Sequence, residues 1–145
     1  MVEVSEYEEL AQNFKRALME KIKSSQPYWT LLGIEMLDIK KGWAKLQLPF
    51  AKKLTHPYGI AHGGVIFSLA DSAVAMALLG LVEKGKRFTT VEMNINYVSP
   101  FREGNITAEA RIVNKGSRIA LGDVDVRDDQ GGLVAKCLAT YTIMK

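Results

Sequence analysis

The amino-acid sequence predicts an α+β domain in which a curved antiparallel sheet wraps around one long apolar helix. Three observations support this prediction. The segment 63–82 is almost wholly apolar and is long enough to be the helix at the centre of a core. Two stretches with strand-like patterns precede this segment, and four follow it. The chain has 145 residues, of which 48% are hydrophobic, so it can bury the core of one domain.

The composition excludes several classes of protein. Charged residues make up 24% of the chain and the net charge is only +3, which is typical of a globular domain rather than a disordered one. No run of basic residues is longer than two, so we expect no nucleic-acid partner. The lone Cys137 excludes a disulfide scaffold and a multi-cysteine metal site. The acidic start lacks the pattern of a signal peptide, and we expect a cytoplasmic protein.

The segment 63–82 is also long enough to cross a bilayer. However, Asp71 lies near its centre, where a carboxylate costs about 2.5–3.5 kcal/mol on insertion. The segment is rich in Ala, Gly and Ser rather than in large apolar residues. We therefore expect a buried helix and no membrane partner.

The elements on either side follow from periodicity and turn residues. An amphipathic helix is predicted over 5–24, because Ser5 and Glu8 form a capping box and apolar residues recur every three or four positions. A connector of about one helical turn follows at 28–33. The stripe of that first helix would consist of Tyr7, Leu10, Ala11, Phe14, Leu18 and Ile22.

Six strands are predicted, with a loop at 51–61 before the central helix. In the second strand, alternation places Ala44, Leu46 and Leu48 on one face. One sheet covers only one side of a helix, so the remaining helix surface and the sheet edges predict a dimer. The predicted strands cover 34–40, 43–50, 88–98, 105–113, 118–127 and 133–144.

Two features of the apolar helix could carry chemistry. The first is its start at His62, Gly63 and Gly64, where backbone N–H groups lack helical partners and can hold a carboxylate, a phosphate or an oxyanion. The two glycines could instead serve only the close packing of a turn. The sequence alone leaves both interpretations open.

The second feature is Asp71, which has no cation within one helical turn on either side. Burying an unpaired carboxylate is costly, and such groups cluster at functional sites. A well-placed general base contributes about 100–10,000-fold to a rate. The alternative is a structural carboxylate that accepts hydrogen bonds from Ser68, Ser72 or a distant arginine.

Gly64 and Asp71 are seven residues apart, which is about 10.5 Å along a helix. An oxyanion donor and a base that act on one carbonyl must both lie within about 3 Å of the reacting atoms. One regular helix cannot supply both groups. We therefore expect a composite site, with Gly64 from one chain and Asp71 from its partner.

Two segments carry a resemblance to a known family. Residues 59–71 read GIAHGGVIFSLAD, and residues 91–100 read VEMNINYVSP. Together they resemble the PaaI-type acyl-CoA thioesterases of the hotdog-fold superfamily, and the resemblance extends from about residue 30 to the C-terminus. It implies a hotdog thioesterase domain over 28–145, preceded by an N-terminal helix and connector over 1–27. It also implies a homodimer or a homotetramer built as a dimer of dimers.

The resemblance names five candidate catalytic residues and implies a role for four of them. Asp71 corresponds to the catalytic carboxylate, acting as base or nucleophile on the thioester. Gly64 corresponds to the backbone N–H that polarises the thioester carbonyl, and His62 helps to orient that carbonyl. Thr90 stands where some relatives place a serine near the attacking water. His56 departs from the family, because many relatives carry an asparagine there.

The resemblance also implies that coenzyme A is bound by Gly63 and near the turn that contains Lys115, Ser117 and Arg118, with no metal and no organic cofactor. Solvated turn residues are the alternative for each of the last three. The sequence also raises a conflict in the strand at 88–98. If Val91 and Met93 face the helix, Thr90 faces away from it unless a bulge intervenes.

Two other functions stay open. A non-catalytic acyl-CoA sensor could share the fold, although sensors of this kind carry an added DNA-binding segment. A hotdog dehydratase would pair the helix acid with a histidine, and no histidine lies on the same helical face as Asp71. A metal site at Asp123, Asp125, Asp128 and Asp129 is not expected, because the spacing does not match a calcium loop.

Overall fold

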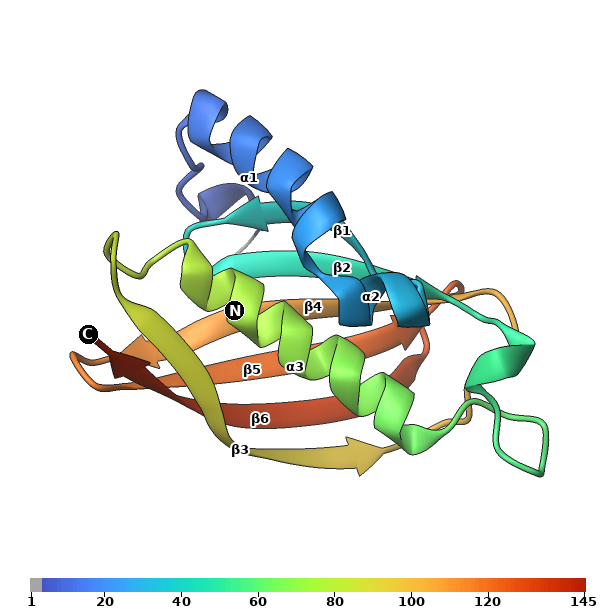
Figure 1. Cartoon of the computed structure of the whole chain (residues 1–145). Coiled ribbons are helices and arrows are strands. Elements are labelled where there is room, and N and C mark those ends of the chain that lie inside the picture. Colours follow the sequence, from blue (N-terminus) through green and yellow to red (C-terminus); the bar gives the residue numbers. More distant parts are fainter. Residues whose placement is uncertain (1–3) are drawn as a thin grey trace.

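The computed structural model describes residues 4–145 and contains one six-stranded antiparallel sheet with a long helix across it (Figure 1). The strand order is β1-β2-β4-β5-β6-β3, and every predicted strand is present with ends within two residues of the prediction. This confirms the α+β architecture and the hotdog arrangement. The strands are β1 (Glu35–Lys40), β2 (Trp43–Pro49), β3 (Arg87–Tyr97), β4 (Asn105–Lys115), β5 (Ile119–Asp128) and β6 (Leu133–Met144).

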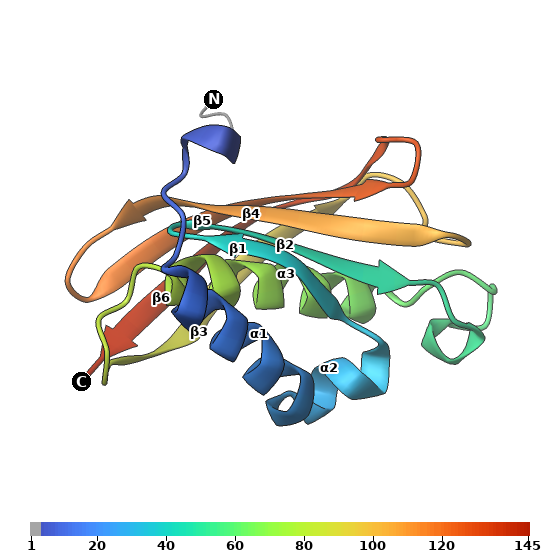
Figure 2. The ribbon, with the colours of Figure 1, turned by 90° about the horizontal axis from the view of Figure 1, so that it is seen from above.

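The helices are α1 (Gln12–Ser25), α2 (Pro27–Leu32) and α3 (Gly63–Leu79), with short 3₁₀ turns at Val4–Glu6 and Lys52–Leu54. Figure 2 shows α3 lying under the sheet. Helices α1 and α2 lie on the same side of the sheet as α3, next to β1. The one-turn connector predicted at 28–33 is the short helix α2. No helix within residues 4–145 is long and apolar enough to cross a membrane.

The core lies between α3 and the inner face of the sheet. Nine residues of α3 are buried, and Ala44, Leu46 and Leu48 of β2 are fully buried, as their alternation predicts. The helix approaches β5 closely at Gly122, where a Cβ atom would lie 2.5 Å from Cγ1 of Val74. A glycine is therefore needed at this contact. The helix ends at Leu79, three residues before the apolar segment does.

The N-terminal helix differs from the prediction. It begins at Gln12 rather than at residue 5, so the predicted capping box of Ser5 and Glu8 is wrong. The physical reason is that Glu8 is used elsewhere: its carbonyl accepts the backbone N–H of Lys41 at 2.9 Å, and its carboxylate pairs with the Lys41 ammonium at 3.0 Å. The chain before α1 is thus held against the turn between β1 and β2.

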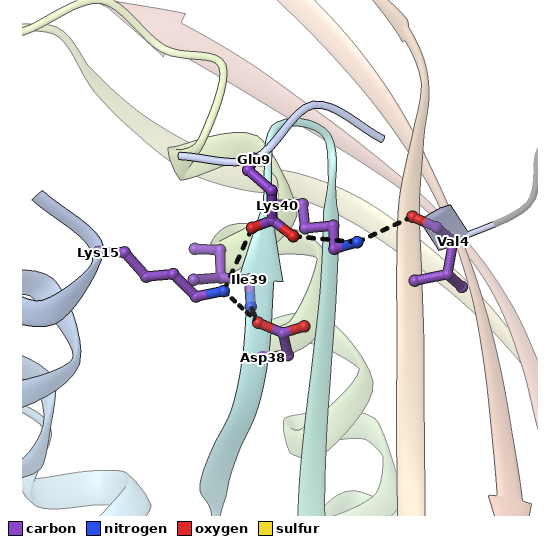
Figure 3. A network of polar contacts seen from close by, with 6 residues as sticks. All are labelled: Val4, Glu9, Lys15, Asp38, Ile39 and Lys40. Carbon is purple, nitrogen blue, oxygen red and sulfur yellow. Dashed lines mark hydrogen bonds and ion pairs between the residues drawn. The ribbon is translucent and has the colours of Figure 1, made fainter. Parts of the chain in front are cut away.

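A network of charged groups fixes this arrangement (Figure 3). Lys15 of α1 lies 2.6 Å from Asp38 of β1 and 3.4 Å from Glu9. Lys40 of β1 pairs with Glu9 at 3.2 Å and donates to the carbonyl of Val4 at 3.1 Å. The network therefore joins the segment before α1, α1 itself and β1.

The predicted stripe of the first helix is only partly buried. Leu10 and Ile22 are buried, whereas Phe14 is 52% exposed. Leu10 lies before the helix rather than on it, because the chain is not helical there. The stripe was predicted for a continuous helix from residue 5, but Tyr7, Leu10 and Ala11 lie before α1.

Candidate functional site

The start of α3 is capped by its own preceding histidine. His62 is the N-cap residue, and its Nδ1 atom accepts the backbone N–H of Gly64 at 3.0 Å. This bond requires the neutral tautomer with the proton on Nε2. The Gly64 N–H, which the resemblance predicts to be an oxyanion donor, thus lies at the helix N-terminus and donates to an imidazole in the single chain.

Gly63 has a packing role as well as a position at this terminus. The Tyr97 hydroxyl donates to the Gly63 carbonyl at 2.8 Å, and a Cβ atom on Gly63 would lie 3.0 Å from the Tyr97 ring. The phenol can reach the helix start only because Gly63 has no side chain. Packing therefore accounts for Gly63, while Gly64 is exposed.

A hollow of about 310 Å³ lies beside this helix start. His56 lines it, and His56 Nδ1 accepts the backbone N–H of Tyr58 at 3.1 Å. The rings of His56 and His62 are 6.4 Å apart between centroids. The two histidines and the glycines thus gather at one end of α3. The other lining residues include Ile60, Ala61, Ile66, Tyr97 and Phe101.

Asp71 lies in the middle of α3 and is half-buried. Its Oδ1 atom accepts two hydrogen bonds, from Thr90 Oγ1 at 2.8 Å and from the Tyr141 hydroxyl at 2.5 Å. Within residues 4–145, no hydrogen bond or ion pair reaches Oδ2. The carboxylate is therefore fixed through one oxygen and has its second oxygen unpartnered in the chain.

The partners suggested from sequence for Asp71 are wrong. Ser68 donates to the Gly64 carbonyl at 2.9 Å, and Ser72 accepts the indole N–H of Trp29 at 3.0 Å. Both serines lie on the side of α3 that faces α2, because Trp29 belongs to α2 and Tyr28 of α2 bonds Ser68. No arginine pairs with Asp71 within residues 4–145.

Tyr141 is the site residue that sequence reasoning missed. It is buried on β6, and burial, together with the nearby charge of Asp71, raises the pKa of its phenol far above the ordinary value. The phenol therefore stays protonated and donates. The alternation of 133–144 places Tyr141 on the buried face of its strand, and a buried tyrosine usually needs a hydrogen-bond partner. This pattern could have identified Tyr141 from the sequence.

A β-bulge resolves the conflict over Thr90. Thr90 pairs with Tyr141, but Glu92 pairs with Thr140, so Val91 is an extra residue in β3. Val91 is 57% exposed and does not face the helix. Because the bulge shifts the alternation by one, Thr90 and Met93 both point toward α3. Thr90 can therefore donate to Asp71.

The structure does not bring all predicted site residues together. Helix α3 is a continuous α-helix from residue 63 to 79, so Gly64 and Asp71 of one chain remain about 10.5 Å apart along its axis. Asp71, Thr90 and Tyr141 form one group, and His56 with the helix start forms another. Within one chain the two groups therefore do not meet.

The three turn residues predicted to bind coenzyme A lie at the opposite end of the sheet from Gly63. Lys115 ends β4, and Ser117 and Arg118 lie exposed before β5. The Arg118 carbonyl accepts from Ile143, which pairs with the start of β3, whereas Gly63 contacts the end of β3 (Figure 1). Within one chain these residues do not meet the helix start.

The acidic residues after residue 120 have structural partners. Asp125 pairs with Arg111 at 2.8 Å, and Asp123 pairs with Lys136 at 2.8 Å. Asp128 and Asp129 accept backbone N–H groups of nearby turns. Within residues 4–145, no cluster of three histidine, cysteine or acidic side chains could hold a metal ion.

Comparison with known proteins gives the family. A family model described as "Thioesterase superfamily" matches residues 58–135. A Saccharolobus solfataricus protein named "Putative esterase SSO1253" is 34% identical over 88% of this chain and 84% of its own length. The 1,4-dihydroxy-2-naphthoyl-CoA hydrolase of Listeria monocytogenes is 29% identical over 77% of this chain and 89% of its own length.

Solved structures agree. Thioesterase HI1161 of Haemophilus influenzae superposes with a TM-score of 0.83 at 25% identity, covering 96% of this chain and 94% of its own. The PaaI protein of Escherichia coli has the same fold, with a TM-score of 0.83 at 21% identity, covering 93% of this chain and 97% of its own. The matched family segment contains the glycine-rich start of α3 and Asp71, which carry the resemblance in the sequence. This chain therefore belongs to the thioesterase superfamily.

Proposed function

We propose that this protein hydrolyses an acyl-CoA thioester to a free acid and coenzyme A, with Asp71 as the catalytic carboxylate. The observation that carries the proposal is the state of Asp71: two hydroxyl donors hold Oδ1, and Oδ2 has no partner within residues 4–145. The family membership supports thioester hydrolysis, and the relative named as a CoA hydrolase supports coenzyme A as the leaving group.

The reaction needs a nucleophile on the carbonyl carbon and a donor for the carbonyl oxygen. Oδ2 of Asp71 can take a proton from a water molecule that attacks the carbonyl, or it can attack directly and form an anhydride that water then cleaves. In either route the C–S bond breaks, and the thiolate of coenzyme A takes up a proton. Thr90 and Tyr141 hold the carboxylate in orientation for this step.

The oxyanion donor is the Gly64 N–H of a partner chain, helped by the positive end of α3. The separation of Gly64 and Asp71 on one regular helix supports this arrangement. The long edge strand β3 also supports it, because Val91 and Tyr97 of the strand and Val98 directly after it are exposed. His62 orients the thioester carbonyl. When the substrate binds, the Gly64 N–H donates to the thioester oxygen instead of to His62 Nδ1. We propose a homodimer as the minimal active unit, and two such dimers can form a tetramer.

Binding of the nucleotide end of coenzyme A is assigned to the turn at Lys115, Ser117 and Arg118. Two cations and a hydroxyl in one exposed turn suit phosphate groups. Gly63 and His56 belong to the hollow at the helix start, where they border the thioester.

A thiol-release assay over a panel of aromatic and aliphatic acyl-CoAs tests the proposal. We expect turnover by the wild type, and a loss of about 100-fold or more in kcat for Asp71→Asn, which keeps the hydrogen bonds to Thr90 and Tyr141 but cannot act as a base. Equal rates for the two proteins would reject the role of Asp71. Tight acyl-CoA binding without turnover would indicate a sensor, and water addition to an enoyl thioester would indicate a dehydratase.

A further inference from the structure

We propose that Tyr97 is a positioning residue that strengthens the oxyanion donor at Gly64, because it donates a hydrogen bond to the carbonyl of the same peptide group. The inference rests on the proposed function, since it concerns the N–H assigned there to the thioester oxygen. It gives a role to a residue of β3 to which the thioesterase resemblance assigns none.

The geometry joins both residues through one planar unit. The Gly63 carbonyl and the Gly64 N–H are the two ends of a single peptide bond. Tyr97 donates to the carbonyl at 2.8 Å, and the N–H donates to His62 Nδ1 at 3.0 Å. Chains of hydrogen bonds polarise one another, so a donor on the carbonyl makes the N–H at the other end a stronger donor.

The bond from Tyr97 is additional to the helix. In a regular α-helix the Gly63 carbonyl already accepts the N–H four residues later, so the phenol occupies the second lone pair. Reaching it requires a glycine, since a Cβ on Gly63 would lie 3.0 Å from Cζ and from the hydroxyl oxygen of Tyr97. This hydrogen bond therefore requires both a glycine at position 63 and a tyrosine at position 97.

The position of Tyr97 at the end of β3 allows it to donate to the Gly63 carbonyl. It is the last residue of β3, pairs with Ala135 of β6 and lines the hollow beside the helix start. Burial raises the pKa of its phenol, so the group remains a donor throughout the pH range of an assay. Without the phenol the Gly63 carbonyl keeps its helical hydrogen bond, so losing the hydroxyl should cost the fold little.

The expected effect is modest and measurable. An oxyanion donor contributes about 100–1,000-fold to a rate. Strengthening that bond by about 10–30% multiplies the rate by about 1.6- to 8-fold. We expect Tyr97→Phe, which keeps the ring against Gly63, to lower kcat by about this factor while KM and the melting temperature stay unchanged.

Tyr28 offers a matched control. Its phenol is 53% exposed and bonds Ser68 of the same helix at 2.7 Å, but it does not touch the Gly63–Gly64 peptide. Tyr28→Phe removes a similar hydroxyl of α2 that bonds α3 near its start. Its kcat should remain within about 1.5-fold of the wild type, because the Ser68 hydroxyl that it bonds donates to the Gly64 carbonyl, which belongs to the peptide group after the one that carries the Gly64 N–H.

The test combines kinetics with the infrared spectrum of a bound substrate. The Asp71→Asn enzyme is expected to turn an acyl-CoA over at least about 100-fold more slowly, so the thioester carbonyl can be recorded before hydrolysis and its stretching frequency reports the strength of its hydrogen bonds. Adding Tyr97→Phe to that enzyme should move the frequency toward the value in solution, and adding Tyr28→Phe should not.

Two results would overturn the inference: an unchanged kcat and carbonyl frequency in the Tyr97→Phe proteins, or equal changes with Tyr28→Phe. A rise in KM at constant kcat would also overturn it, because it would show that Tyr97 contacts the bound substrate directly. If the wild type hydrolyses no thioester, the proposed function itself has failed, and that result is distinct from these.

Discussion

The Tyr141 hydroxyl lies 2.5 Å from Oδ1 of Asp71 and 2.8 Å from the carbonyl oxygen of the same residue. One phenol from β6 therefore fixes both the backbone and the side chain of Asp71 at the middle of α3. The phenol is buried and its pKa is raised, so it acts as a permanent donor. This contact leaves Oδ2 as the oxygen that can meet a water molecule or a thioester.

Removing this donor should impair the chemical step. We expect Tyr141→Phe to lower kcat by about 10-fold or more, because a hydrogen bond to a charged group is worth about 1.5–3 kcal/mol and the carboxylate would lose its fixed orientation. KM should change by less than about twofold. Steady-state kinetics with the best acyl-CoA provide the measurement. An unchanged kcat with a lower melting temperature would show that Tyr141 serves packing alone.

Thr90 allows a more selective comparison. Thr90→Val keeps the shape of the side chain and removes the donor to Asp71, whereas Thr90→Ser keeps the hydroxyl. We expect kcat to fall by about 3- to 10-fold in the valine variant and to stay within about twofold in the serine variant. Equal kcat values for valine and serine would contradict a role for the hydroxyl.

The strand and helix patterns were readable from local sequence. The apolar segment predicted α3, and the alternation of Ala44, Leu46 and Leu48 predicted the inner face of β2. These features depend on the period of each element alone. The separation of Gly64 and Asp71 along α3, on which the proposed composite site rests, was also predictable, because seven residues on a helix have a known length.

Other features depend on contacts between distant segments, which local periodicity does not contain. Glu8 reads as a helix cap, but Lys41 of the next hairpin competes for it and the helix starts later. The bulge at Val91 changes which face Thr90 occupies, and no turn residue in β3 signals it. Tyr141 lies 70 residues after Asp71, and only the strand order brings them together.

The ion pairs on the outer face of the sheet predict a pH-dependent stability. Burial alone would raise the pKa of Asp125, but the hydrogen bond from Lys136 and the charges of Lys136 and Arg111 outweigh it, and the pKa is lowered. A lowered pKa stabilises the fold above the unfolded value of about 3.9, and this stabilisation is lost as the pH falls below it.

Asp125→Asn should therefore lower the free energy of unfolding by about 1–3 kcal/mol at pH 7, because Arg111 and Lys136 lose a charged acceptor. The difference from the wild type should shrink below about pH 4. Urea unfolding at pH 7 and pH 3 measures both values, with the exposed Glu103→Gln as control. A constant difference across this range would contradict the assigned pKa.

Cys137 predicts the behaviour of the protein in thiol assays. The residue is 2% exposed, and burial raises the pKa of its thiol to about 12. Almost no thiolate exists at pH 8, so the native protein should not react with an aromatic disulfide reagent, whereas the urea-unfolded chain should release one equivalent. Stoichiometric reaction of the native protein within minutes would contradict this assignment.

Complementation between two inactive chains tests the composite site most directly. Asp71→Asn removes the carboxylate, and Gly64→Pro removes the N–H at a first-turn position where proline is tolerated in a helix. Each variant alone should be inactive. Co-expressed with different tags and purified through both, the mixed assembly should recover about a quarter to a half of the wild-type rate, because one site combines an intact Gly64 with the partner's intact Asp71. A mixed assembly no more active than either variant alone would contradict a site shared between two chains.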